Sequence, residues 1–151
     1  MARRVSERRN YWGAFVLDWF QYLQDNDFSG SDFKVLFFLC ERMQVSDNSI
    51  YLRQNHIAAE LNMDKGNVSK CIRKLSEKQF IVKKPNGFMI NPHLFYVGKR
   101  DRGVREMLRN EFDDYLVELG KEPRFYLNED EHRLEEIDGD SEDFTYMDGV
   151  F

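Results

Sequence analysis

The stretch from residue 54 to residue 96 constrains the fold of this chain most strongly, because its apolar spacing changes from helical to extended. At its centre, residues 63–78 carry apolar side chains on one helical face and basic side chains on the opposite face. The apolar positions are Val68, Cys71, Ile72 and Leu75, and the basic positions are Lys70, Arg73 and Lys74. Asp64 is a suitable N-cap, so a basic amphipathic helix is predicted to begin directly after it.

A shorter helix is predicted before this basic helix. Residues 54–61 place Ile57, Ala58 and Leu61 on one side of a helix. Asn62 tolerates the left-handed backbone conformation that a tight corner between helices needs. We therefore expect two helices joined by a short corner.

A β-hairpin is predicted after the basic helix. The β-prone runs at residues 80–82 and 88–90 flank residues 83–87, KKPNG, which signal a turn. Helix, corner, basic helix and hairpin in this order are typical of a winged helix-turn-helix. In such a fold the second helix enters the major groove of DNA.

A basic helix followed by a hairpin could also be an ordinary solvated surface. The distribution of charge favours DNA binding instead. Residues 53–105 hold twelve Lys and Arg against four Asp and Glu, a net charge of +8, in a chain whose net charge is -5. A local positive field of this kind attracts phosphate groups and releases their counterions.

Further elements are predicted on the N-terminal side. Ser31 is expected to cap a helix that extends to about Gln44, and residues 48–52 are typical of a short strand. The aromatic segment 11–23 is interpreted as a helix, although residues 15–20 could equally form a strand.

On the C-terminal side, an amphipathic helix is predicted over residues 103–119, and Gly120 ends it. Its apolar face could pack on the body of its own domain. It could also pack on a second copy of the chain and form a homodimer.

The expected fold is one domain, mainly α with a small antiparallel β-sheet. Residues 1–30 would be a basic arm and an aromatic lead-in, and residues 31–120 a winged helix-turn-helix with a trailing helix. The N- and C-terminal extensions would thus be helical. Residues 121–151 would form an acidic, flexible tail, because residues 127–151 hold ten Asp and Glu against Arg133 alone.

The sequence does not indicate catalysis. His56, His93 and His132 are isolated, and no Gly-rich phosphate loop is present. Cys40 and Cys71 lack the spacing of a zinc site and fit core thiols of a reducing compartment. We expect no catalytic residue, no metal and no cofactor. No segment has the apolar length of a membrane span or the pattern of a secretory signal, so a cytoplasmic location is expected.

Several short sequence segments, and the segment through which the chain leaves the hairpin, resemble those of a known family. The runs are Ser31–Leu36, Ile50–Leu52, Asn67–Ser69 and Ile72–Leu75, and the exit is Asn86–Phe95, which contains Asn91-Pro92 and is followed by Gly98-Lys99. Over residues 14–116 the chain resembles plasmid replication proteins of the Firmicute RepL type. The resemblance implies an initiator, of a plasmid or phage, that binds double-stranded DNA at an origin and recruits host factors. A transcriptional repressor, or an interaction protein that acts through its acidic tail, remains the alternative.

The candidate DNA-binding residues lie on the basic helix and on the hairpin. Asn67, Ser69, Lys70 and Arg73 would approach base edges or flanking phosphates, while Lys65 and Lys74 would hold the DNA backbone. Lys83 and Lys84 would bind phosphate from the hairpin. The other candidates are Arg53, Gln54 and Asn86.

The end of the chain combines acids with apolar side chains. Its candidate partner-binding residues are Phe144, Tyr146, Val150 and Phe151. The segment is similar to the terminal peptide of bacterial single-stranded DNA-binding proteins, which implies docking on host replication proteins. Two other interpretations remain open, a tail that is only solvated and a tail that folds back on the basic body and competes with DNA.

Overall fold

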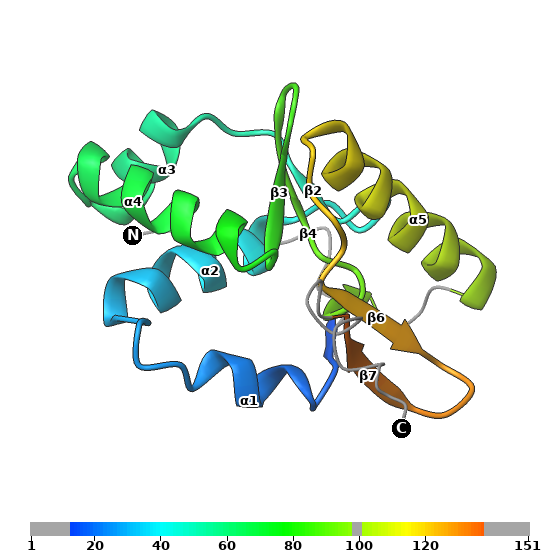
Figure 1. The fold of residues 1–151 in the computed structure, drawn as a ribbon. Coiled ribbons are helices and arrows are strands. Elements are labelled where there is room, and N and C mark those ends of the chain that lie inside the picture. Colours follow the sequence, from blue (N-terminus) through cyan, green and yellow to red (C-terminus); the bar gives the residue numbers. More distant parts are fainter. Residues whose placement is uncertain (1–12, 98–100, 138–151) are drawn as a thin grey trace.

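The computed structural model describes residues 13–97 and 101–137 of the chain, and these residues form helices and small antiparallel sheets (Figure 1). The helices are α1 (Trp19–Leu23), α2 (Gly30–Arg42), α3 (Gln54–Leu61), α4 (Lys65–Glu77) and α5 (Arg102–Glu118). The strands are β1 (Gly13–Phe15), β2 (Ser49–Ile50), β3 (Ile81–Lys84), β4 (Gly87–Ile90), β5 (Phe95–Val97), β6 (Phe125–Asn128) and β7 (Arg133–Glu136). One sheet has the order β2-β4-β3, and two further pairs are β1-β5 and β6-β7. The expected combination of helices with small antiparallel sheets is therefore present.

Helices α3 and α4 and the corner between them follow the sequence prediction. Asn62 has φ 54° and ψ 48°, the left-handed conformation expected at the corner. The Asp64 side chain accepts a hydrogen bond from the backbone N–H of Asn67 at 3.1 Å and so caps α4. Local chemistry alone accounts for this turn and for the start of α4.

The β3–β4 hairpin turns over two residues, Pro85 and Asn86, and pairs Lys84 with Gly87. A Cβ atom at Gly87 would lie 1.9 Å from the carbonyl oxygen of Ile50, so only glycine lets β4 approach β2 this closely. The turn that was predicted from sequence is thus also the point where the hairpin joins β2.

The two faces of the three-stranded sheet pack against different helices, because alternate side chains of a strand point to opposite faces. Ile81, Phe88 and Ile90 belong to the main core with α2, α3 and α4. Val82 and Met89 pack instead against α5. In Figure 1 the hairpin accordingly stands between the pair α3 and α4 on one side and α5 on the other.

The apolar face of α5 packs on its own sheet through Leu108, Phe112 and Leu116, which are all buried. The face proposed for a homodimer over residues 103–119 is therefore used within the chain. Met107, Val117 and Leu119 remain exposed on this helix or at its end.

The aromatic lead-in differs from the predicted helix. Residues 13–15 form β1, which pairs with β5 so that Phe15 lies opposite Phe95 with 4.6 Å between ring centroids. The helix α1 begins only at Trp19, which is fully buried. The helical interpretation of the whole segment was wrong, because strand pairing with a distant segment determines its first part.

Helix α2 begins at Gly30, so the predicted cap at Ser31 was wrong. The Ser29 side chain accepts a hydrogen bond from the Asp32 backbone, and the Asp32 side chain accepts one from the Ser29 backbone. Ser29 is the N-cap in place of Ser31, because a capping box needs an acceptor side chain three residues after the cap and Asp32 stands at that position.

The segment after α5 also differs from its prediction as a flexible tail. Residues 125–128 and 133–136 form a hairpin, and Phe125, Leu127 and Leu134 are buried. Its backbone is anchored to the body: the Leu127 N–H donates to His93 Nδ1 at 3.0 Å. The apolar residues of this hairpin alternate along a strand, a pattern that the surrounding acids obscure.

An ionic cluster joins the β6–β7 hairpin to α5. Glu129 contacts Arg105 at 2.7 Å and Arg109 at 2.8 Å, and Arg109 is only 4% exposed. The hydrogen bond from Arg105 lowers the pKa of Glu129 to about 2, with a smaller contribution from Arg109 and against the effect of burial. The cluster therefore keeps its carboxylate ionised at neutral pH.

Candidate nucleic-acid interface

The exposed face of α4 presents cations that have no partner in the described part of the chain. Val68, Cys71, Ile72 and Leu75 are buried on the opposite face and fix the rotation of the helix. Lys65, Lys70 and Arg73 are exposed, and no hydrogen bond or ion pair joins them to another described residue. These side chains are therefore available to an external anion.

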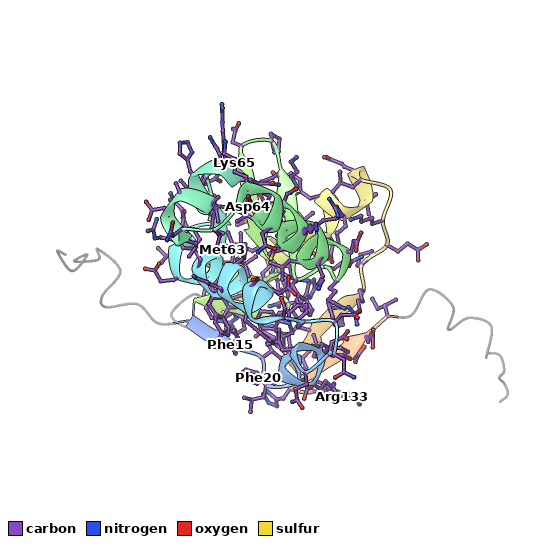
Figure 2. The ribbon with its side chains drawn as sticks, turned by 90° about the vertical axis from the view of Figure 1, so that its left-hand side faces the viewer. Phe15, Phe20, Met63, Asp64, Lys65 and Arg133 are labelled. Atoms are coloured by element: carbon purple, nitrogen blue, oxygen red, sulfur yellow. The ribbon has the colours of Figure 1, made fainter. Side chains whose placement is uncertain are left out.

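Helix α4 begins at the surface of the molecule, at the corner after α3. Figure 2 shows Lys65 at the end of the molecule opposite Phe20 and Arg133. Asn67 is exposed in the same first turn, and Ser69 is half-buried. The start of the helix is thus open to a ligand, while the aromatic lead-in lies at the far end.

An open groove of about 750 Å³, here called the α4 groove, runs along one side of α4. Residues at the start of α2 and in the segment before β6 form the rest of its lining. Its lining residues are Asp27, Ser29, Asp32, Asn67, Lys70, Cys71, Arg73, Lys74, Glu77, Lys78 and Arg124. Five of these side chains are basic and three are acidic. Lys74, Lys78 and Arg124 are paired with Asp32, Asp25 and Glu136, so Lys70 and Arg73 are the cations of the groove that have no partner among the described residues.

Lys74 lines this groove but already has internal partners. Its ammonium group donates to the Asp32 carboxylate at 2.9 Å and to the Asp27 carbonyl at 2.5 Å. Burial opposes the ionisation of Asp32, but hydrogen bonds from the Ser29 backbone and from Lys74 hold its pKa below its usual value. Lys74 thus fastens α4 to the start of α2, a role that its position on the basic face did not reveal.

A second groove, here called the hairpin groove, lies between the start of α3 and the β3–β4 hairpin and has a volume of about 560 Å³. It brings together predicted residues that stand about thirty positions apart in the sequence. They are Arg53, Gln54, Lys83, Lys84 and Asn86, and Tyr51, Leu52, His56, Pro85, Gly87 and Phe88 complete the lining. The start of α3, the positive end of its helix dipole, opens toward the same groove.

The two hairpin lysines differ in their surroundings. Lys83 is exposed. Lys84 donates to Ser49 Oγ at 3.0 Å and to the Tyr51 hydroxyl at 3.1 Å, and its ammonium lies 5.5 Å from the centre of the Tyr115 ring. Lys84 therefore ties the hairpin to β2 and to α5, whereas Lys83 is open to solvent.

Most of the predicted DNA-binding side chains thus lie in or beside these two grooves. Sequence reasoning did not find Lys78 or Arg124, which also line the α4 groove. Arg124 comes from the segment that had been assigned to the tail. The predicted partner-binding residues Phe144, Tyr146, Val150 and Phe151 lie outside the described residues.

Both cysteines are buried in the core. Cys40 and Cys71 are free and buried, and burial raises their pKa values to about 12 and about 11, respectively. Within residues 13–97 and 101–137, no group of three or more His, Cys, Asp or Glu side chains is placed to hold a metal ion. None of the described helices combines the length and apolar character needed to cross a membrane.

A family model described as Firmicute plasmid replication protein (RepL) matches residues 5–137, which include both grooves. No curated protein and no solved structure matches the chain at a significant level. The chain belongs to the RepL family of Firmicute plasmid replication proteins.

Proposed function

We propose that the chain is an initiator that binds duplex DNA sequence-specifically, with α3 and α4 acting as a helix-turn-helix and the β3–β4 hairpin as its wing. The observation that carries this proposal is the exposed face of α4, where Lys65, Lys70 and Arg73 have no partner among the described residues. The opposite face is buried, so α4 presents these cations from a fixed position.

The dimensions of α4 suit a major groove. Its 13 residues give a helix of roughly 20 Å, and the major groove of B-DNA, about 12 Å wide, admits an α-helix. Arg73 and Asn67 have the side-chain chemistry that reads guanine and adenine edges, and Lys70 can contact guanine or phosphate. Ser69 would contact the DNA at the margin of this face. We assign base recognition to this helix.

The hairpin groove would hold the sugar–phosphate backbone. Lys83 supplies an exposed ammonium group, and Arg53, Gln54 and Asn86 line the same groove. Contacts to phosphate position a protein on DNA but carry no sequence information directly. Lys74 and Lys84 would contribute indirectly, because their internal contacts fix α4 and the hairpin in place.

An initiator of this kind acts by marking an origin and assembling other proteins there. Recruitment of host replication proteins through Phe144, Tyr146, Val150 and Phe151 stays a prediction, since these residues lie outside the described part. No step of the proposed function requires a catalytic group.

Footprinting of the full chain on the DNA around its own coding sequence tests the proposal. The expected result is one protected segment that an excess of unrelated duplex does not abolish. Protection within a replication origin supports an initiator, whereas protection within a promoter alone supports a transcriptional regulator. Absence of any protected segment at low salt would contradict DNA recognition altogether.

A further inference from the structure

We propose that residues 138–151 of this same chain occupy the α4 groove when DNA is absent. This acidic segment would then cover part of the surface that duplex DNA uses. Competition with DNA rests on the proposed function of α4. The contact between residues 138–151 and the groove can be tested without DNA.

The described chain ends at the margin of the α4 groove. The Ile137 backbone N–H donates to the carbonyl oxygen of Arg124 at 2.6 Å, which fixes the last described residue beside Arg124. Arg124 lines the groove, and its guanidinium donates to the carbonyl oxygen of Lys78 at 3.1 Å. The last described residue, Ile137, therefore lies next to a residue that lines the groove.

The charges of the groove and of the segment are complementary. Lys70 and Arg73 have no partner in the described part of the chain, whereas the buried acid of the groove, Asp32, is already paired with Lys74. Residues 138–151 contain no Lys or Arg and carry five acids, which are Asp138, Asp140, Glu142, Asp143 and Asp148. The segment can thus supply the anions that the exposed face of α4 lacks.

The segment is also long enough. Fourteen extended residues span at most roughly 46 Å, more than twice the roughly 20 Å length of α4. Attachment to the same chain gives the segment an effective concentration on the order of millimolar, so even a weak contact would be populated.

Carbodiimide cross-linking tests the contact directly, because this reagent joins a lysine ammonium only to a carboxylate that touches it. The full chain should give cross-links from Lys70 to the acids of residues 138–148, and duplex DNA should suppress them. Lys34 is the control, since it is exposed on α2 and does not line the groove. Equal cross-linking of Lys34 and Lys70, or none at Lys70, would overturn the proposal.

DNA affinity tests the consequence with two variants of equal charge. Glu142→Gln with Asp143→Asn should tighten binding to duplex DNA at low salt on the order of threefold, and the gain should disappear at high salt. Asp114→Asn with Glu118→Gln adds the same charge on the exposed side of α5 and should change affinity much less. Equal gains from both pairs would show a general effect of net charge and would contradict occupation of the groove.

The two tests separate the inference from the proposed function. Cross-links at Lys70 without any DNA binding would leave the contact intact and refute DNA recognition. DNA binding without these cross-links would refute the contact alone. In that case docking of residues 138–151 on a host replication protein becomes the better explanation of their acids and aromatic side chains.

Discussion

Arg73 lies on the exposed face of α4, four positions before the end of the helix, and Val68, Ile72 and Leu75 are buried on the opposite face. It is exposed and has no partner among the described residues, so its guanidinium carries no structural role there. This combination distinguishes it from Lys74, whose ammonium is fixed by Asp32 and by the Asp27 carbonyl. Neighbouring cations on one helix can thus have different functions.

Replacing Arg73 by Ala should weaken specific DNA binding without unfolding the protein. A bidentate contact to guanine contributes on the order of 1–3 kcal/mol, so the dissociation constant should rise by about 5- to 150-fold, with relaxed preference at one base pair. Binding titrations with the preferred duplex and with its single-base variants measure both effects. Lys34→Ala, on α2, is the matched control and should bind as the unaltered chain does.

Replacing Glu129 by Gln should destabilise the fold at neutral pH. Arg109 is 4% exposed and would lose its counter-charge, which costs on the order of 3 kcal/mol in the free energy of unfolding. Because the pKa of Glu129 is lowered from 4.5 to about 2, its stabilisation is complete above pH 4.5 and declines as the pH falls toward 2. The difference between variant and unaltered chain should therefore shrink over that range.

Urea denaturation at pH 7, 4 and 3 measures this loss. Asp130→Asn is the control, since Asp130 pairs with Arg102 at 2.7 Å on the exposed surface and such pairs contribute little. A Glu129 variant that is as stable as the unaltered chain at pH 7 would show that the cluster does not hold the β6–β7 hairpin.

At the scale of elements, the helices α3 and α4 could be predicted from sequence because short-range chemistry determines them. Asn62 and Asp64 define the corner and the cap, and the apolar spacing defines the buried face. The strand β1 could not be predicted in the same way, since its partner β5 lies about eighty residues away. The β6–β7 hairpin likewise depends on His93, whose ring accepts the Leu127 N–H.

The same limit applies to the candidate site. The exposed positions of α4 could be predicted from helical periodicity alone. The internal partners of Lys74 and Lys84 could not, because Asp32 and Tyr51 are brought to them only by the folded chain. Arg124 was missed because its place in the α4 groove depends on the packing of the segment after α5.

The β3–β4 hairpin should act on DNA through charge rather than through base recognition. Lys83→Ala should weaken binding to all duplexes by a similar factor and reduce the salt dependence by about one phosphate contact. Lys84→Ala is the informative comparison, since it should lower thermal stability by removing contacts to Ser49 and Tyr51. A changed sequence preference in the Lys83 variant would instead make the hairpin a base reader.

At the scale of the whole molecule, the three-stranded sheet separates two surfaces that differ in how their basic side chains are paired. On one side lie α3, α4 and the two grooves, where exposed cations lack partners among the described residues. On the other side lies α5, whose Arg102, Arg105 and Arg109 are paired with acids of the segment after it. Among the described residues, the arginines of α5 are therefore neutralised, whereas Lys65, Lys70 and Arg73 of α4 are available to an external anion.

The most direct test of this division is a map of the residues that duplex DNA contacts. Backbone amide NMR spectra of the full chain, recorded with and without the footprinted duplex, provide that map. We predict that the largest changes fall at residues 65–73 of α4 and around Lys83 and Asn86, while α5 and the β6–β7 hairpin change little. Changes centred on α5 or on β6–β7, with α4 unaffected, would contradict the account.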